Sequence, residues 1–282
     1  MKVIKHPADM QILSNNIRKT NQTIGFVPTM GYLHKGHISL LDTARGQSDQ
    51  VILSIFVNPT QFGPEEDLSV YPRDLPKDLD IAEKAGVDIV FTPNVDHLYG
   101  KNYQTYVNLK QLPNHLCGLH RPNHFQGVST VVTKLFNIVK PHLAYFGEKD
   151  YQQLAVIRQM VLDLNFDIQI IGCPIVREND GLAMSSRNVY LSKDHRKTAL
   201  VLSQSLNLTQ EKVFKGIILV ETLINEAQEM ILAQSETQID YIRICNKDTL
   251  EDIQTITEDC LMALAVKVDK TRLIDNKILK IA

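Results

Sequence analysis

Five apolar runs in the first two thirds of the chain are typical of strands buried on both faces of a parallel sheet. Each run is nearly continuous in its apolar character, as in parallel strands covered on both sides, and each is followed by glycine, proline or a polar residue. They cover residues 24–27, 51–58, 87–93, 143–146 and 168–176.

The segments between these runs favour helices, which are expected at 7–19, from near His37, and at 76–85, 127–139 and 151–164. Strands that alternate with helices predict a Rossmann-like, doubly wound parallel sheet, because parallel neighbours need crossover connections. This α/β domain is expected to cover residues 1–176. The polar stretch at 94–123 is expected to be a long loop with some strand in it.

The pattern changes after residue 177. Two helices are expected at 194–214 and 220–234, and strand-like runs follow at 239–245, 260–268 and 277–282. Residues 177–282 therefore predict a second, smaller α+β domain, which is expected to act as a lid.

Composition favours small-molecule partners. A net charge of -2 over 282 residues gives no global attraction to nucleic acid or to an anionic membrane. Neither a signal peptide nor a membrane span is expected, so the predicted location is the cytoplasm. The four cysteines show no metal-ligand spacing and are expected to stay reduced.

The segment from Thr23 to Arg45 predicts a phosphate site. A buried strand is followed by Gly31 and then by a helix that begins near His37, three residues after His34. Backbone N–H groups at a helix N-terminus attract phosphate, and two imidazoles add donors. Solvated surface histidines are the alternative. The segment lacks the Lys and Ser/Thr of a P-loop, so that motif is rejected.

Other polar residues follow the predicted strands, where doubly wound sheets bind ligands. Neutral amides suit a hydroxy acid, and cations and hydroxyls suit phosphate. For each residue an ordinary surface or capping role stays open, and Asp78 and Asp80 are expected to be solvated helix carboxylates rather than metal ligands. The candidates are Gln61, Gln153, Lys149, Asp150, Ser185, Ser186 and Arg187.

Several motifs resemble the pantoate–β-alanine ligase (pantothenate synthetase) family, within the nucleotidyltransferase-like superfamily that carries HxGH. They are PTMGYLHKGH (28–37), FVNPTQF (56–62), YPR (71–73), RPNHFQGVSTVVTKLFN (121–137), FGEKDYQQ (146–153), MSSRN (184–188) and TRLIDN (271–276). The resemblance covers nearly the whole chain. Asn123 and Asp269 stand where many members have glycine.

The resemblance implies an ATP- and magnesium-dependent homodimer that joins D-pantoate to β-alanine. It implies catalytic roles for His37, His34 and Lys149. The implied ATP contacts are Met30, Gly31, His34, His37, Gly147, Lys149, Asp150, Val176, Met184, Ser185, Ser186 and Arg187. The implied substrate contacts are Gln61, Gln153, Asn58 and His124, and no residue is assigned as a metal ligand.

The expected mechanism has two steps. The pantoate carboxylate attacks the α-phosphorus of ATP and releases pyrophosphate, and the β-alanine amine then displaces AMP from the pantoyl adenylate. One alternative is a nucleotidyltransferase that moves AMP onto a phosphorylated acceptor. The other is a nucleotide-sensing module without turnover.

Overall fold

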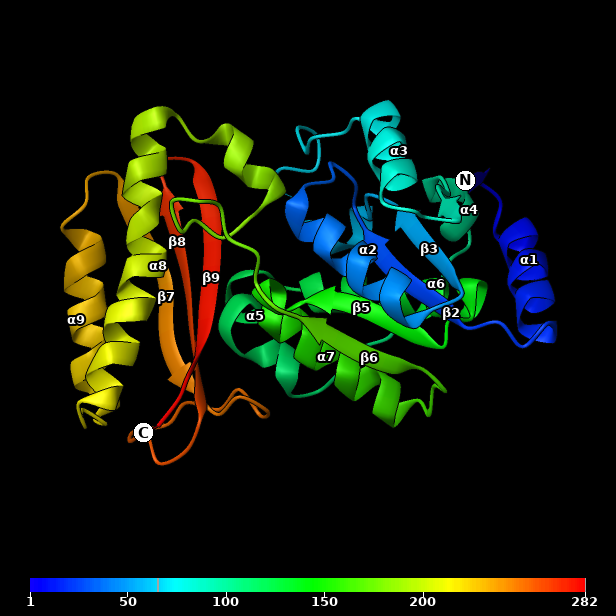
Figure 1. Ribbon diagram of the computed structural model, residues 1–282. Helices are drawn as coiled ribbons and strands as arrows, with labels where there is room; N and C mark the ends of the chain where they lie inside the picture. The colour runs from blue at the N-terminus through cyan, green and yellow to red at the C-terminus, as the bar shows by residue number, and fades with distance from the viewer. Residues whose placement is uncertain (65, 282) are drawn as a thin grey trace. The chain divides into compact units, whose positions relative to one another are not determined.

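The computed structural model describes residues 1–64 and 66–281, and these residues form two compact units (Figure 1). The first unit comprises residues 1–110, 121–148 and 153–174. The second comprises residues 111–120, 149–152 and 175–282. Two short inner segments, residues 111–120 and 149–152, group with the second unit.

A six-stranded sheet in the order β1-β4-β3-β2-β5-β6 forms the centre of the first unit, and all of its strand pairs are parallel. Its central strand β2 has β3 on one side and β5 on the other, so the chain reverses its direction of winding there. The crevice beside such a switch point is where open α/β sheets bind ligands. The strands are β1 (Lys2–Ile4), β2 (Ile24–Thr29), β3 (Gln50–Ile55), β4 (Ile89–Phe91), β5 (Leu143–Gly147) and β6 (Gln169–Cys173).

Helices cover both faces of this sheet. They are α1 (Pro7–Lys19), α2 (Lys35–Gln47), α3 (Leu75–Lys84), α4 (Val95–Leu98), α6 (His124–Val139) and α7 (Tyr151–Asp163). Successive strand residues point to opposite faces, so Phe26 packs with α1, α6 and α7 whereas Val27 packs with α2 and α3. The short 3₁₀ helices η1 (Pro59–Gln61) and η3 (Glu148–Asp150) follow β3 and β5.

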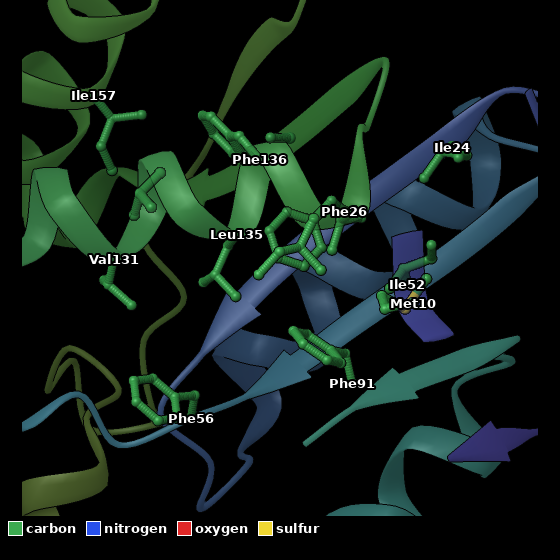
Figure 2. Packing of buried hydrophobic residues seen from close by; sticks show 14 of the residues in the cluster. Met10, Ile24, Phe26, Ile52, Phe56, Phe91, Val131, Leu135, Phe136 and Ile157 are labelled. Carbon is green, nitrogen blue, oxygen red and sulfur yellow. The ribbon is translucent and has the colours of Figure 1, made fainter. Parts of the chain in front are cut away.

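Phenylalanine rings pack together within one of these two cores. Figure 2 shows Phe26, Phe91 and Phe136 gathered between the sheet and α6. The rings of Phe26 and Phe136 meet edge to face, with centroids 6.4 Å apart. All three side chains are almost completely buried, and burial of one Phe side chain contributes about 1.5–3 kcal/mol. The core therefore fixes the strands whose carboxyl ends carry the candidate site.

The second unit has an antiparallel sheet in the order β7-β8-β9. The strands are β7 (Thr237–Cys245), β8 (Cys260–Val268) and β9 (Thr271–Leu279), and they share a hydrophobic core with α8 (Lys193–Phe214) and α9 (Val220–Leu232). The unit also contains η2 (Leu112–Asn114), α5 (Leu116–His120) and η4 (Ser186–Tyr190).

The predicted fold class is confirmed: a doubly wound parallel sheet and a smaller α+β part. The expectation of some strand between residues 94 and 123 is wrong, since the described structure there consists of α4, η2, α5 and irregular chain. Strand β1 was missed because its two apolar residues lie between Lys2 and Lys5 and form no continuous apolar run, and β9 begins six residues before the expected run at 277. Among the described residues, no helix is both long and apolar enough to cross a membrane.

Left-handed backbone explains both departures from the family pattern. Asn123 has φ 64° immediately before α6, and Asp269 has φ 52° in the turn between β8 and β9. Glycine is the easiest residue to place there, and Asn and Asp tolerate this region better than most others. Asn123 thus adopts the left-handed backbone before α6 without glycine.

Candidate active site

The turn between β2 and α2 is fixed by a carboxylate from another helix. Gly31 has φ +85° and Tyr32 has φ 53°, so the chain reverses sharply there. The Asp78 side chain accepts hydrogen bonds from the backbone N–H groups of Tyr32 (2.8 Å) and Leu33 (2.7 Å). A Cβ on Gly31 would lie 2.9 Å from Asp78 Oδ2, so glycine allows this close approach.

The expectation that Asp78 is solvated is wrong: only 2% of its surface is exposed. Burial raises the pKa of the Asp78 carboxyl, against the lowering effect of the hydrogen bonds from Leu33 and Tyr32. Asp80 does behave as predicted, since it is exposed and pairs with Lys84 one turn later (2.7 Å). Two carboxylates on one helix thus have different roles.

The two histidines form a capping box at the start of α2. His34 is the N-cap, and its Nδ1 accepts from the backbone N–H of Gly36 (3.1 Å). His37 Nδ1 accepts in turn from the backbone N–H of His34 (3.3 Å). The helix therefore begins at Lys35, two residues before the expected start, because an imidazole replaces the usual Ser, Thr or Asp cap.

This arrangement determines the tautomer of both rings. Because each Nδ1 accepts a backbone hydrogen bond, the proton of each neutral ring lies on Nε2. The rings lie near each other, with centroids 4.1 Å apart, and both are half-buried. His34 and His37 therefore offer two N–H donors at a helix N-terminus, which is a suitable arrangement for phosphate.

Two amide side chains follow β3 on η1. Asn58 caps this short helix and is 1% exposed, and Gln61 is 8% exposed. Asn58 Nδ2 donates to Gln61 Oε1 (3.1 Å), while Gln61 Nε2 lies 3.3 Å from the sulfur of Met30. The structure thus brings together three of the predicted residues, from the ends of β2 and β3.

His124 supports the same short helix. Arg121 contacts His124 Nε2 (3.1 Å), and because guanidinium can only donate, the proton lies on Nδ1, which donates to the backbone carbonyl of Gln61 (2.8 Å). Arg121 also forms a two-pronged ion pair with Glu66. The predicted contact of His124 with substrate stays a prediction; its position shows that it holds the backbone of Gln61.

Gly127 on α6 allows η1 to pack closely. A Cβ at this position would lie 2.3 Å from the carbonyl oxygen of Thr60 and 2.7 Å from the nitrogen of Gln61. Both contacts are with backbone, which cannot move aside as a flexible side chain can. Glycine is therefore required where α6 meets the helix that carries Gln61.

Gly147 ends β5, and the next residues divide between the two units. Gln153 is half-buried in the first unit, on the first turn of α7. In the second unit, Lys149 has a largely buried side chain and its carbonyl accepts from Asn276 Nδ2 (2.8 Å). The Asp150 carboxylate is 51% exposed and lies 4.0 Å from Lys149 Nζ.

Gln152 is a structural residue that the sequence argument missed beside Gln153. Its Oε1 accepts from Cys117 N (2.9 Å), and its Nε2 donates to the carbonyls of Leu112 (2.9 Å) and His115 (2.7 Å). The side chain is 6% exposed. Gln152 thus satisfies three backbone groups of the 112–117 segment.

The remaining candidates lie on a well-anchored loop of the second unit. The carbonyl of Val176 accepts from Met184 N (3.0 Å). Ser185 is the N-cap of η4 and accepts from the N–H of Arg187 (3.3 Å), so its capping role is real. Ser186 is buried and Arg187 is half-buried.

The base of this loop is fixed by an ion pair. Arg177 binds Asp275 of β9 with two hydrogen bonds, at 2.7 and 2.9 Å, and the Asp275 side chain is 3% exposed. Glu178 accepts from Asn188 Nδ2 (2.9 Å) and from Arg196 (2.8 Å). The loop is therefore held at both ends within its own unit.

A doubly wound sheet with imidazole donors at the helix after β2 and fixed amides after β3 defines a Rossmann-like nucleotide-binding α/β protein. Comparison with known proteins identifies one family within this class. The family model described as "Pantoate-beta-alanine ligase" matches residues 2–278. The chain belongs to the pantoate–β-alanine ligase family, and it is a ligase that joins pantoate to β-alanine.

Similar proteins cover the chain from end to end. A pantothenate synthetase from Desulfatibacillum aliphaticivorans is 58% identical and covers 99% of this chain and 100% of its own. A crystal structure of pantothenate synthetase from Thermus thermophilus has 42% identity and a TM-score of 0.94, covering 99% and 100% of the two chains.

One solved relative contains ligands. The pantoate-beta-alanine ligase from Francisella tularensis, complexed with Beta-gamma ATP and Beta-alanine, has 36% identity and a TM-score of 0.82, covering 99% of this chain and 97% of its own. These similarities favour the ligase over the nucleotidyltransferase and the nucleotide-sensing module.

Proposed function

We propose that the ligase works through an enzyme-bound pantoyl adenylate. A carboxylate oxygen of D-pantoate attacks the α-phosphorus of ATP, and the bond to pyrophosphate breaks. The amine of β-alanine then attacks the acyl carbon, the bond from that carbon to the phosphate oxygen breaks, and AMP leaves with the electron pair while the amine loses a proton. The products are pantothenate, AMP and pyrophosphate.

The observation that carries this proposal is the pair of backbone hydrogen bonds that His34 Nδ1 and His37 Nδ1 accept. Capping of α2 places the proton of each ring on Nε2, so His34 and His37 are donors fixed by the backbone before ATP arrives. Preorganised donors stabilise the charge that grows on the phosphate oxygens in the transition state. His37 and His34 are therefore assigned to the ATP phosphates.

The other phosphate-binding groups are proposed from residue type and family resemblance. Lys149 supplies a cation, and Ser185, Ser186 and Arg187 supply hydroxyls and a guanidinium, which together suit phosphate oxygens. Further ATP contacts are proposed for Met30, Gly31, Gly147, Asp150, Val176 and Met184. Lys149 completes the proposed catalytic set.

Pantoate is proposed to bind Gln61 and Gln153, with Asn58 and His124 in support. A neutral amide orients a carboxylate and a hydroxyl without neutralising the carboxylate, which must stay nucleophilic. The buried position of Gln61 and its fixed side-chain oxygen support this role.

Magnesium is proposed to arrive with ATP as part of the substrate. The described residues contain no group of three or more His, Cys, Asp or Glu side chains that could hold an ion. Mg²⁺ commonly relies on substrate phosphates and water with one or two carboxylates, so this donor set fits MgATP rather than a resident metal cage. The ion would neutralise charge on the phosphates.

The test separates the capping role of His37 from its proposed catalytic role. His37→Asn keeps an acceptor at the position of Nδ1, which preserves the cap, but removes the Nε2–H donor. Pyrophosphate release in a single turnover should slow by about 10²–10³-fold, as expected for loss of one preorganised donor. An unchanged rate would overturn the assignment, and the melting temperature of the variant checks that the cap is retained.

A homodimer in the cytoplasm completes the proposal. The dimer rests on family resemblance alone, and sedimentation equilibrium of the purified chain tests it. The cytoplasmic location rests on the use of ATP and on four cysteines that are all free. Fractionation of the source cells tests the location.

A further inference from the structure

The amide group of Asn58 is held in one orientation. Its Oδ1 receives hydrogen bonds from the hydroxyl of Tyr99 (2.8 Å), the hydroxyl of Thr60 (3.0 Å) and the backbone N–H of Thr60 (3.4 Å). Its Nδ2 donates to the carbonyl of Gly127 (3.1 Å) and to Gln61 Oε1 (3.1 Å). Donors surround the oxygen and acceptors surround the nitrogen, so a flipped amide would lose these bonds.

This orientation determines which end of Gln61 faces a ligand. Gln61 Oε1 accepts the hydrogen bond from Asn58 Nδ2, so the Gln61 oxygen is held toward Asn58. Gln61 Nε2 lies against the sulfur of Met30 at 3.3 Å, and a thioether is only a weak acceptor. Gln61 is therefore prepared to donate N–H groups, which suits a carboxylate or hydroxyl oxygen of the substrate.

Tyr99 is built rigidly into the same region. It follows α4, its ring lies 6.4 Å from that of Phe56, and Tyr103 packs edge to face against it at 5.0 Å. The Lys134 ammonium lies 5.7 Å from the Tyr99 ring centroid. Burial raises the pKa of Tyr99 to about 12, so the hydroxyl keeps its proton and stays a donor at neutral pH.

We propose that Tyr99 is a positioning residue for pantoate: its hydroxyl fixes the amide of Asn58, which turns the N–H groups of Gln61 toward the pantoate oxygens. This inference rests on the proposed role of Gln61. Tyr99 acts through Asn58 and touches no reacting atom, and its hydroxyl also lies 3.3 Å from the Thr60 hydroxyl, which bonds the same Asn58 oxygen. The relay runs from Tyr99, in the aromatic cluster that follows α4, through Asn58 to Gln61, the last residue of η1.

The test compares Tyr99→Phe with Tyr103→Phe in steady-state kinetics. Both changes remove one phenolic hydroxyl from the same aromatic cluster, but only the first removes the hydrogen bond to Asn58. Tyr99→Phe should raise the KM for pantoate by about tenfold, which corresponds to one lost hydrogen bond, and should leave the KM for ATP within about twofold. Tyr103→Phe should change neither. An unchanged KM for pantoate in Tyr99→Phe would overturn the proposal.

A double-mutant cycle with Gln61→Ala separates the relay from general destabilisation. If Tyr99 acts through Gln61, Tyr99→Phe should have no further effect on the KM for pantoate once Gln61 is Ala. An equal effect in both backgrounds would contradict the relay. If Gln61→Ala alone leaves that KM unchanged, the proposed role of Gln61 fails instead, whatever Tyr99→Phe does.

The single variant Asn58→Ala tests the same relay if Tyr99→Phe unfolds at the assay temperature. Asn58→Ala removes the middle of the relay and should itself raise the KM for pantoate. A normal KM for pantoate in a folded Asn58→Ala protein would overturn the proposal. Thermal unfolding of every variant identifies those that are folded.

Discussion

The carboxylate of Asp78 on α3 lies 2.7 Å from the backbone nitrogen of Leu33, the residue directly before His34. It accepts a second bond from Tyr32 and is buried. Two backbone donors in a strained turn are thus satisfied by a side chain 45 residues further along the sequence. The position of the paired histidines therefore depends on α3 as well as on α2.

Replacement of Asp78 by Asn should disturb that turn. One amide oxygen cannot accept both bonds in this geometry, and its NH₂ group faces a backbone N–H. We expect a loss of about 1–3 kcal/mol in the free energy of unfolding. A fall in kcat/KM of about ten- to a hundredfold should accompany it as His34 shifts. Urea unfolding and steady-state assays measure the two effects.

Asp80→Asn is the matched control, because Asp80 lies on the same helix but its ion pair with Lys84 is exposed. Such a pair contributes at most about 1 kcal/mol, so stability and activity should change little. Equal effects of the two substitutions would show that the bonds from Asp78 to the turn are unimportant.

Gly127→Ala should push η1 away from α6. The new methyl group would meet the backbone of Thr60 at 2.3 Å, and overpacking of this kind typically costs about 1–3 kcal/mol. Because Gln61 lies on η1, the KM for pantoate should rise together with the loss of stability. Calorimetry and substrate titration check both results.

Gly46→Ala on α2 provides the comparison, because a Cβ at Gly46 meets nothing within 4 Å. Alanine is a better helix former than glycine, so this change should stabilise the protein by about 0.5–1 kcal/mol. Should Gly127→Ala prove equally harmless, the close packing of η1 on α6 would not matter for the site.

The ion pair between Glu66 and Arg121 should make stability depend on pH. Burial raises the pKa of Glu66, but the hydrogen bond and charge of Arg121, with His124 and a backbone bond, lower it more, so the net pKa lies below 4.5. A lowered pKa in the folded state adds stability above pH 4.5, and this stability is lost as the pH falls through the folded-state pKa.

Glu66→Gln should therefore be less stable than the parent chain at pH 7, and the difference should shrink as the pH falls below about 4.5. Urea unfolding of both proteins across this range measures the difference. A gap that stays constant or widens toward acid pH would contradict the sign of the shift.

Substitution of the neighbouring residues Gln152 and Gln153 should have different effects, the first on stability and the second on activity. Gln152→Ala removes the side-chain partner of two buried backbone groups, Cys117 N and Leu112 O, and one of two bonds to the His115 carbonyl, so we expect a loss of about 1–3 kcal/mol or more. Gln153→Ala should instead raise the KM for pantoate with little change in melting temperature. The same pair of measurements on both variants tests the contrast, and identical profiles would refute it.

The strands of both units were largely predictable from sequence, because burial on both faces leaves an apolar run that is visible locally. The run at 24–27 marked β2, and the runs at 260–268 and 239–245 marked β8 and most of β7. Strand β1 was not visible, since Val3 and Ile4 lie between two lysines and form no longer apolar run. The 94–123 segment was misjudged because its order depends on contacts with distant residues.

For the candidate site, the sequence indicated residue types and the family pattern, but not the supporting contacts. His34 and His37 were found from a local pattern, whereas Asp78 resembled an ordinary helix carboxylate. Gln152 was passed over because the family resemblance assigns a role only to its neighbour Gln153. Tyr99 was one of several tyrosines in an expected loop. Each of these three acts on residues distant in sequence, which no local pattern reveals.

The adenylate route is tested most directly by isotope transfer. Pantoate labelled with ¹⁸O in its carboxylate is converted with ATP and β-alanine, and the AMP is examined by mass spectrometry. If the carboxylate attacks the α-phosphorus, one labelled oxygen stays with phosphorus when the amine displaces AMP, so each AMP formed from fully labelled pantoate carries one ¹⁸O. Unlabelled AMP, with the label in pyrophosphate or phosphate, would contradict the pantoyl adenylate.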